Sequence, residues 1–147
     1  MSRRGPHGNT LIELVALLAV LGILASVAVP TAAGARRALA GRTAAQRLAL
    51  VLRAAQATAQ AQGSPVDVSV GADGSYQVSQ ALSGGRVERG ELGAPATSNF
   101  PDGSLSFSPT GSPCLPATAT PRAGSFVFGA ATGRTVVVQL GGCIRCR

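Results

Sequence analysis

The sequence predicts an α+β protein in which one long N-terminal helix packs on a small antiparallel β-sheet domain. Three observations support this fold class. The stretch from Leu14 to Ala35 has no charged residue and consists mainly of Leu, Val, Ile and Ala. From Ala35 to Gln62 the chain is rich in helix formers and contains no proline. Beyond Pro65, apolar and polar residues alternate, which is typical of strands.

The first half of the predicted helix has the length and composition of a transmembrane segment. Residues 14–35 number 22, and as a helix they would span about 33 Å, close to the hydrocarbon thickness of about 30 Å. A cleaved secretory signal is the alternative, because Arg3 and Arg4 precede the apolar run. Glu13 argues against that alternative, since a carboxylate at the edge of a membrane segment is costly unless it has a function.

The second half of the predicted helix is amphipathic. Its apolar residues recur at steps of three and four and form one stripe, which we expect to face the sheet. The helix is expected to end at Gly63-Ser64-Pro65, because glycine suits the position after a helix and proline cannot continue it. The stripe consists of Leu48, Val51, Leu52, Ala55 and Ala59.

The remainder of the chain predicts strands separated by turns. Val66 to Val70 and a second segment around Tyr76 and Val78 flank a turn at residues 71–74, which together indicate a hairpin. Residues 109–123 contain four prolines and are expected to form a loop. Further strands are expected at Arg86 to Leu92, Ser104 to Ser108, Ser125 to Gly129 and Arg134 to Leu140.

The N-terminal sequence carries a processing motif. Gly8-Asn9-Thr10-Leu11-Ile12-Glu13-Leu14, which follows a basic leader and precedes the apolar run, resembles the cleavage site of type IV prepilins and type II secretion pseudopilins. The resemblance implies that a prepilin peptidase cuts after Gly8 and methylates the amine of Asn9. It also implies that Glu13 pairs with the N-terminal amine of a neighbouring subunit and that Pro30 kinks the helix.

The pairing of Glu13 has a physical basis that does not depend on the resemblance. Removing an unpaired ion from water costs several kcal/mol. A newly exposed α-amine is a cation that can compensate this cost. Packing of subunits is therefore favoured in the register where Glu13 meets a neighbour's amine.

Two segments in the C-terminal half, residues 103–111 and 133–138, together with the short basic end, resemble the GspH/FimT group of minor pseudopilins. This resemblance implies a structural subunit of a type II secretion pseudopilus or a type IV pilus, anchored in the inner membrane with its C-terminal domain exported. The implied partners are the prepilin peptidase, other pilin or pseudopilin subunits, the inner-membrane assembly platform and the membrane itself. The expected divisions are a leader at 1–8, a transmembrane and assembly segment at 9–35, an amphipathic segment at 36–63 and a β-rich domain at 64–147.

The charge distribution supports an alternative function. The chain has 13 arginines, no lysine and six acidic residues, for a net charge of +7. No acidic residue follows Asp102, whereas Arg134, Arg145 and Arg147 do. Such a basic patch favours the binding of polyanions. Some FimT-like members are implicated in DNA uptake through a basic tail. DNA binding by these arginines is thus the second hypothesis, and a solvated basic face is its alternative.

The remaining candidate site residues are three cysteines. Cys114, Cys143 and Cys146 all fall in the part expected to be exported, where disulfides persist. Cys114 could pair with either of the others, Cys143 could pair with Cys146, or the thiols could stay free. The only histidine, His7, lies in the leader. We therefore expect no catalytic residues, no metal site and no cofactor.

Overall fold

The computed structural model describes residues 11–80, 88–116, 118–129 and 133–147, and within the helix it leaves out the side chains of 27–32. The chain forms two compact units, Met1–Arg36 and Arg37–Arg147. One helix, α1 (Leu11–Gln62), begins in the first unit and ends in the second.

The first unit consists, in its described part, of the N-terminal portion of α1. Its large apolar side chains from Leu11 to Leu24 are 53–82% exposed. A bilayer crossing requires about 20 predominantly apolar residues in one helix. Among the described residues, which leave out the side chains of 27–32, no helix has the length and apolar character of a membrane span.

In the second unit, α1 buries one face. The buried residues recur at steps of one, three and four, as a helix packed on a flat surface requires. Val51, expected in the stripe, is only partly buried. The helix ends at Gln62, and Gly63 follows with φ +63°, a conformation that favours glycine. The buried residues are Gly41, Ala44, Ala45, Leu48, Ala49, Leu52, Ala55 and Ala59.

The strands form two antiparallel sheets rather than the single sheet expected. The first sheet has the order β3-β2-β1-β5-β6 and the second the order β4-β7-β8-β9. The first contains β1 (Val66–Val70), β2 (Ser75–Gln80), β3 (Glu88–Glu91), β5 (Ser104–Phe107) and β6 (Pro113–Cys114). The second contains β4 (Ala96–Ser98), β7 (Gly124–Phe128), β8 (Arg134–Val138) and β9 (Ile144–Cys146), and the 3₁₀ turn η1 spans Pro101–Gly103.

The expected hairpin is confirmed as β1 and β2, with Val68 opposite Val78. The expected strands at 86–92, 104–108, 125–129 and 134–140 correspond to β3, β5, β7 and β8, although residues 86 and 87 lie outside the described residues. Sequence analysis missed β4, β6 and β9, because two or three residues are too few to show an alternating pattern. The expected loop at 109–123 therefore contains a two-residue strand, β6.

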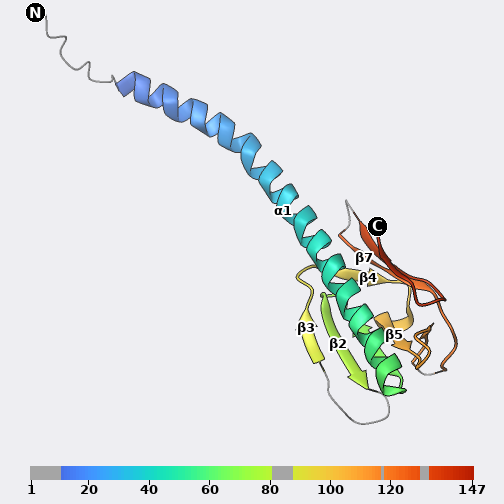
Figure 1. Cartoon of the computed structure of the whole chain (residues 1–147). Coiled ribbons are helices and arrows are strands. Elements are labelled where there is room, and N and C mark those ends of the chain that lie inside the picture. The colour runs from blue at the N-terminus through green and yellow to red at the C-terminus, as the bar shows by residue number, and fades with distance from the viewer. Residues whose placement is uncertain (1–10, 81–87, 117, 130–132) are drawn as a thin grey trace, which may run out of the picture. The chain divides into compact units, whose positions relative to one another are not determined.

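Figure 1 shows α1 running across the faces of both sheets in the second unit. The core lies between α1 and the two sheets and combines the buried helix residues with alternate residues of the strands. In β1, for example, the valines are buried while Asp67 and Ser69 are partly exposed. Phe100 and Phe126 add an aromatic contact with ring centroids 5.3 Å apart. The class predicted from sequence, a helix packed on antiparallel strands, is confirmed.

Candidate functional site

The residues of the predicted processing motif fall at the N-terminal end of the described chain. Gly8 and Asn9 lie outside the described residues. Glu13 lies in the first turn of α1 and is exposed. Pro30 lies within α1, but its side chain is not described.

The apolar surface around Glu13 is unusual for a helix exposed to water. Leu11 and Ile12 are 82% and 76% exposed, and every large apolar side chain up to Leu24 is more than half exposed. Monomeric soluble proteins rarely expose a contiguous apolar surface of this kind unless it contacts lipid or another protein. This part of α1 can therefore act as a packing surface with one acidic group near its start.

The second unit carries a groove between α1 and β9 of about 650 Å³. The helix contributes Gln46, Ala49, Leu50 and Arg53 to the lining, and the C-terminal strand contributes Ile144, Arg145, Cys146 and Arg147. Arg53 donates a hydrogen bond from Nη2 to the Ile144 carbonyl oxygen over 3.2 Å. The groove thus has three arginines and no acidic residue in its lining.

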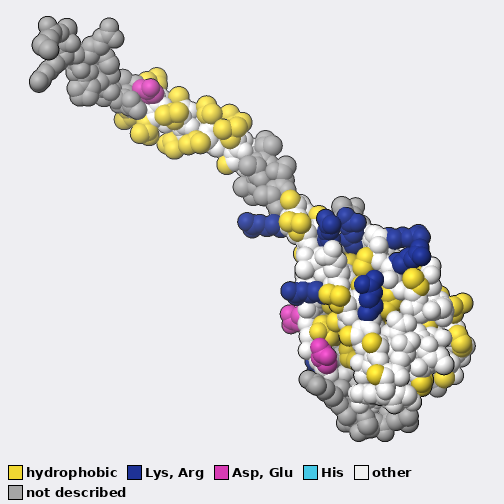
Figure 2. Space-filling model, viewed as in Figure 1, with side chains coloured by type: hydrophobic (Ala, Val, Ile, Leu, Met, Phe, Trp, Pro, Cys, Tyr) yellow, Lys and Arg dark blue, Asp and Glu magenta, His cyan; other side chains and the backbone are white. Residues whose placement is uncertain are grey.

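The groove belongs to a wider separation of charge. On the face drawn in Figure 2, basic side chains of the second unit gather along α1 and around the end where the C-terminus lies, whereas acidic ones lie on the side of β3. Arg145 and Arg147, both predicted, contribute to the groove lining, and alternation along the strand puts them on the sheet face opposite to that of Ile144 and Cys146. Arg134 starts β8 beside Thr135, whose backbone pairs with that of Arg147, but it is not part of the groove lining.

Arg53 was missed by sequence analysis. Its signal was weak, because Gln46, Leu50 and Arg53 share a helix face by spacing but have the composition of an ordinary solvated surface. Only the pairing of β9 with β8 places the C-terminal arginines beside that face.

A side-chain amide of α1 bonds to loops of both sheets. Gln56 Nε2 donates to the carbonyl oxygens of Gly111, at 2.8 Å, and Gly142, at 3.0 Å. Gly111 precedes β6 of the first sheet, and Gly142 lies in the turn that leads into β9 of the second. Gln56 therefore links α1 to a loop of each sheet and helps to position β9.

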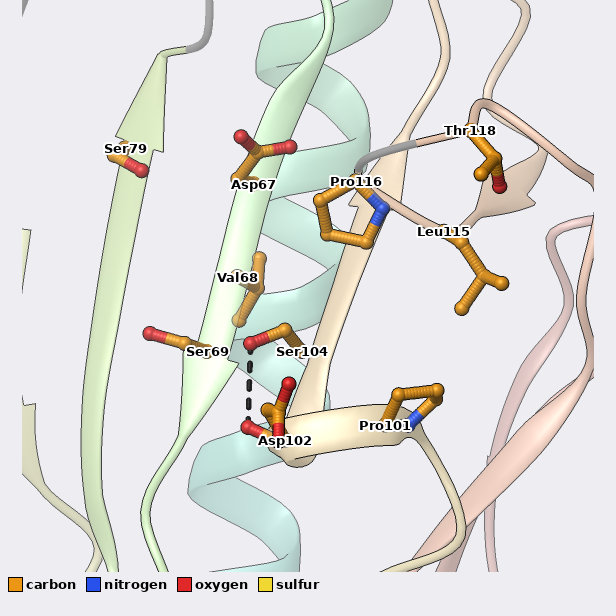
Figure 3. Close-up of a pocket in the computed structure, with 10 residues that line it drawn as sticks. All are labelled: Asp67, Val68, Ser69, Ser79, Pro101, Asp102, Ser104, Leu115, Pro116 and Thr118. Atoms are coloured by element: carbon orange, nitrogen blue, oxygen red, sulfur yellow. Dashed lines mark hydrogen bonds between the residues drawn. The ribbon is translucent and has the colours of Figure 1, made fainter.

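A second hollow, of about 410 Å³, lies over the first sheet. Figure 3 shows its lining on the sheet face opposite α1, with Asp67 on β1 and Asp102 on η1. Ser104 Oγ donates to the backbone oxygen of Asp102 over 3.3 Å. The hollow has carboxylates and hydroxyls but no basic side chain, and no group of three potential metal ligands occurs within the described ranges.

Comparison with known proteins identifies the family. A family model described as type II transport protein GspH matches residues 44–142, more than half of the chain. The chain belongs to the GspH family.

The fold of this GspH-family chain is similar to that of a solved pilin. The type IV minor pilin FimU of Pseudomonas aeruginosa matches in two crystal forms, with TM-scores of 0.57 and 0.55 at 20% and 19% sequence identity. The first match covers 73% of this chain and 87% of FimU, and the second covers 72% and 91%. No curated protein matches the chain significantly. Family and fold together are those of minor pilins and pseudopilins, as the sequence resemblance implied.

The cysteines of the GspH-family chain are free thiols in the structure. Cys114 is buried in β6, and its burial raises the pKa of the thiol, while a hydrogen bond with the Ser106 side chain acts in the opposite direction. The thiol also donates to the Ser106 carbonyl oxygen at 3.4 Å. Cys143 and Cys146 are exposed, and Cys146 Sγ lies 3.7 Å from the Ala45 carbonyl oxygen. Pairing of Cys114 with either of them stays a prediction.

Pairing between Cys143 and Cys146 does not suit this conformation. Cys143 immediately precedes β9 and Cys146 ends it. Three residues of extended chain separate Cα atoms by about 10 Å, whereas a disulfide needs about 4.4–6.8 Å. Exposed thiols at these two positions are therefore available to other molecules rather than to each other.

Proposed function

We propose that this chain is a minor pilin or pseudopilin that is built into a type II secretion pseudopilus or a type IV pilus through its N-terminal helix. The observation that carries the proposal is the exposed apolar surface from Leu11 to Leu24, which contains Glu13 as its acidic group. Such a surface is stable when other apolar helices or lipid cover it. The family and the pilin fold of the second unit support the same role.

Assembly in this proposal begins with cleavage after Gly8 by a prepilin peptidase and methylation of the new amine of Asn9. Glu13 then sets the register, because its carboxylate loses water as helices pack and gains stability only beside a cation. The amine of a neighbouring subunit supplies that cation. The other partners are pilin or pseudopilin subunits and the inner-membrane assembly platform.

We place the subunit in the inner membrane before assembly, with its C-terminal domain exported. The charge-free sequence from Leu14 to Ala35 supports this location. Resistance of the full chain to extraction from membranes at alkaline pH tests it. Complete release into the soluble fraction would contradict a membrane anchor.

Substitution of Glu13 tests the assembly role. We expect Glu13→Ala to reduce the amount of the chain in sheared filaments at least tenfold, the size of effect that a loss of about 1.4 kcal/mol produces, while its level in membranes stays unchanged. Glu91→Ala removes an exposed carboxylate from β3 and is the matched control. Normal incorporation of Glu13→Ala would refute the proposed role of this carboxylate.

DNA binding is a second candidate function, favoured by the acid-free groove that joins Arg53 to Arg145 and Arg147. Three phosphate contacts predict an affinity that falls with salt at a log–log slope of about −2.7. Titration of duplex DNA with the full chain in detergent, at two salt concentrations, tests this. We expect Arg145→Ala with Arg147→Ala to weaken binding and Arg89→Ala, on β3, to leave it unchanged. If the double variant bound DNA as tightly as the wild type, this candidate function would be refuted.

A further inference from the structure

The strand β9 leaves one backbone edge of the second sheet open. Its other edge pairs with β8, where Thr135 and Arg147 exchange two hydrogen bonds of 2.9 and 2.8 Å and Gln139 N–H donates to the Cys143 oxygen at 3.0 Å. Because bonding alternates along an antiparallel strand, the backbone groups of Ile144 and Cys146 point away from β8. They face the groove beside α1.

The groove side of this edge is only partly covered. The Ile144 carbonyl oxygen accepts the bond from Arg53, but a carbonyl has two lone pairs and can accept another. Leu50, which lines the same groove, is 64% exposed. An open edge beside an exposed apolar side chain is the arrangement that strand addition uses for affinity and specificity.

The charges around the edge select what can pair with it. A second β9 would place arginines opposite arginines, which destabilises cross-strand pairing. An extended segment with carboxylates would instead meet Arg145 and Arg147, and Arg53 lies beside the same edge. The edge therefore disfavours pairing with itself and favours an acidic strand.

We propose that an extended acidic segment of another pilin or pseudopilin subunit docks in this groove and adds to β9 as a further antiparallel strand. This inference rests on the proposed subunit function and deepens it by naming a contact between neighbouring β-domains. The added strand places carboxylates opposite Arg145 and Arg147. It places small or apolar side chains opposite Ile144 and Cys146, on the face that contacts α1.

The native thiol of Cys146 provides a direct test with a defined peptide. The probe is acetyl-Val-Asp-Cys-Asp-Val-amide, whose cysteine would lie opposite Cys146 and whose aspartates would lie opposite Arg145 and Arg147. It is supplied as a mixed disulfide with 2-mercaptoethanol. The Cys146 thiolate attacks the peptide sulfur and releases 2-mercaptoethanol, so no net oxidation is needed. The full chain in detergent carries Cys143→Ser, and the buried Cys114 stays in place.

Backbone methylation separates strand pairing from simple charge attraction. In the proposed register the peptide's cysteine N–H points to β9, whereas the N–H groups of its aspartates point away. We expect release of the unmodified peptide to require about a tenfold higher concentration of 2-mercaptoethanol than release of its N-methyl-cysteine form. A tenfold ratio corresponds to the loss of one or two hydrogen bonds. Methylation of the aspartate that follows the cysteine should have no such effect.

Charge variants complete the test. A peptide with lysines in place of aspartates should be retained as poorly as the N-methyl-cysteine form. Arg145→Gln with Arg147→Gln should remove the difference between the aspartate and lysine peptides. Equal retention of all peptides would overturn the proposal.

Retention that depends on charge but not on cysteine methylation would also overturn the proposal. It would indicate a basic surface that binds polyanions such as DNA without strand pairing. Neither result affects the Glu13 experiment. A failed docking proposal is therefore distinguishable from a failed assignment as a filament subunit.

Discussion

Gln56 shows how much one polar side chain can contribute to this fold. Its amide bonds to carbonyl oxygens of two loops that belong to different sheets. We predict that Gln56→Leu lowers the free energy of unfolding by about 1–3 kcal/mol, because it leaves partly buried carbonyl groups without their donor. Urea denaturation measures this. Gln60→Leu is the control, since its amide makes only one exposed contact of 3.5 Å, to Thr110 O. Equal effects of the two substitutions would contradict the linking role.

Asp73 predicts a specific pH dependence. The Ser75 backbone N–H donates to its Oδ1 at 2.9 Å and the Ser75 hydroxyl at 2.7 Å, and these bonds lower the pKa of the carboxyl. A lowered folded-state pKa means that the stabilisation is present above the unfolded value of about 3.9 and is lost as the pH falls through the folded value.

The difference in urea midpoint between the wild type and Asp73→Ala should therefore be larger at neutral pH than below about pH 3. Asp73→Asn keeps an acceptor without a charge and serves as the control. A difference that does not change with pH would show that ionisation of Asp73 is not the cause.

Individual site residues are predictable from the sequence where a pattern distinguishes them from their neighbours. Glu13 stands at the edge of an apolar run, and Arg145 and Arg147 stand in an acid-free segment. Arg53 and Gln56 carry no such mark, because polar residues on an amphipathic helix ordinarily face water. Their partners are carbonyl groups more than fifty residues away in sequence, so only the folded chain reveals them.

At the scale of elements, the helical period was the strongest predictor. It identified Leu48 and Leu52, which are fully buried, and it located the end of α1. The hairpin β1–β2 was equally clear, because five and six residues of alternation are enough to define a strand. The division into two sheets was not predictable, since β4 and β6 are too short to carry a pattern.

The two faces of α1 provide a matched pair of substitutions. Leu52 is fully buried in the core, whereas Leu50 is 64% exposed in the groove. We predict that Leu52→Ala lowers the free energy of unfolding by about 2–5 kcal/mol and that Leu50→Ala changes it by less than about 0.5 kcal/mol. Thermal or urea unfolding of the full chain in detergent compares them. A similar loss for both would mean that α1 packs on the sheets by a different face.

Across the whole chain, the proposed function depends on two exposed surfaces. The exposed apolar helix requires covering by other molecules, and the basic groove with its open strand edge offers a second contact. The two surfaces lie in different units of the chain and can be tested separately. One is proposed to hold the subunit in a filament, and the other to select an acidic neighbour.

We propose that the chain is a processed filament subunit. Intact-mass spectrometry of the chain recovered from sheared filaments, in cells that produce it with its own assembly system, tests this proposal. We expect the chain in this fraction with the mass of residues 9–147 carrying one methyl group. Recovery only in the membrane or soluble fraction, with residues 1–8 still attached, would refute both processing and incorporation.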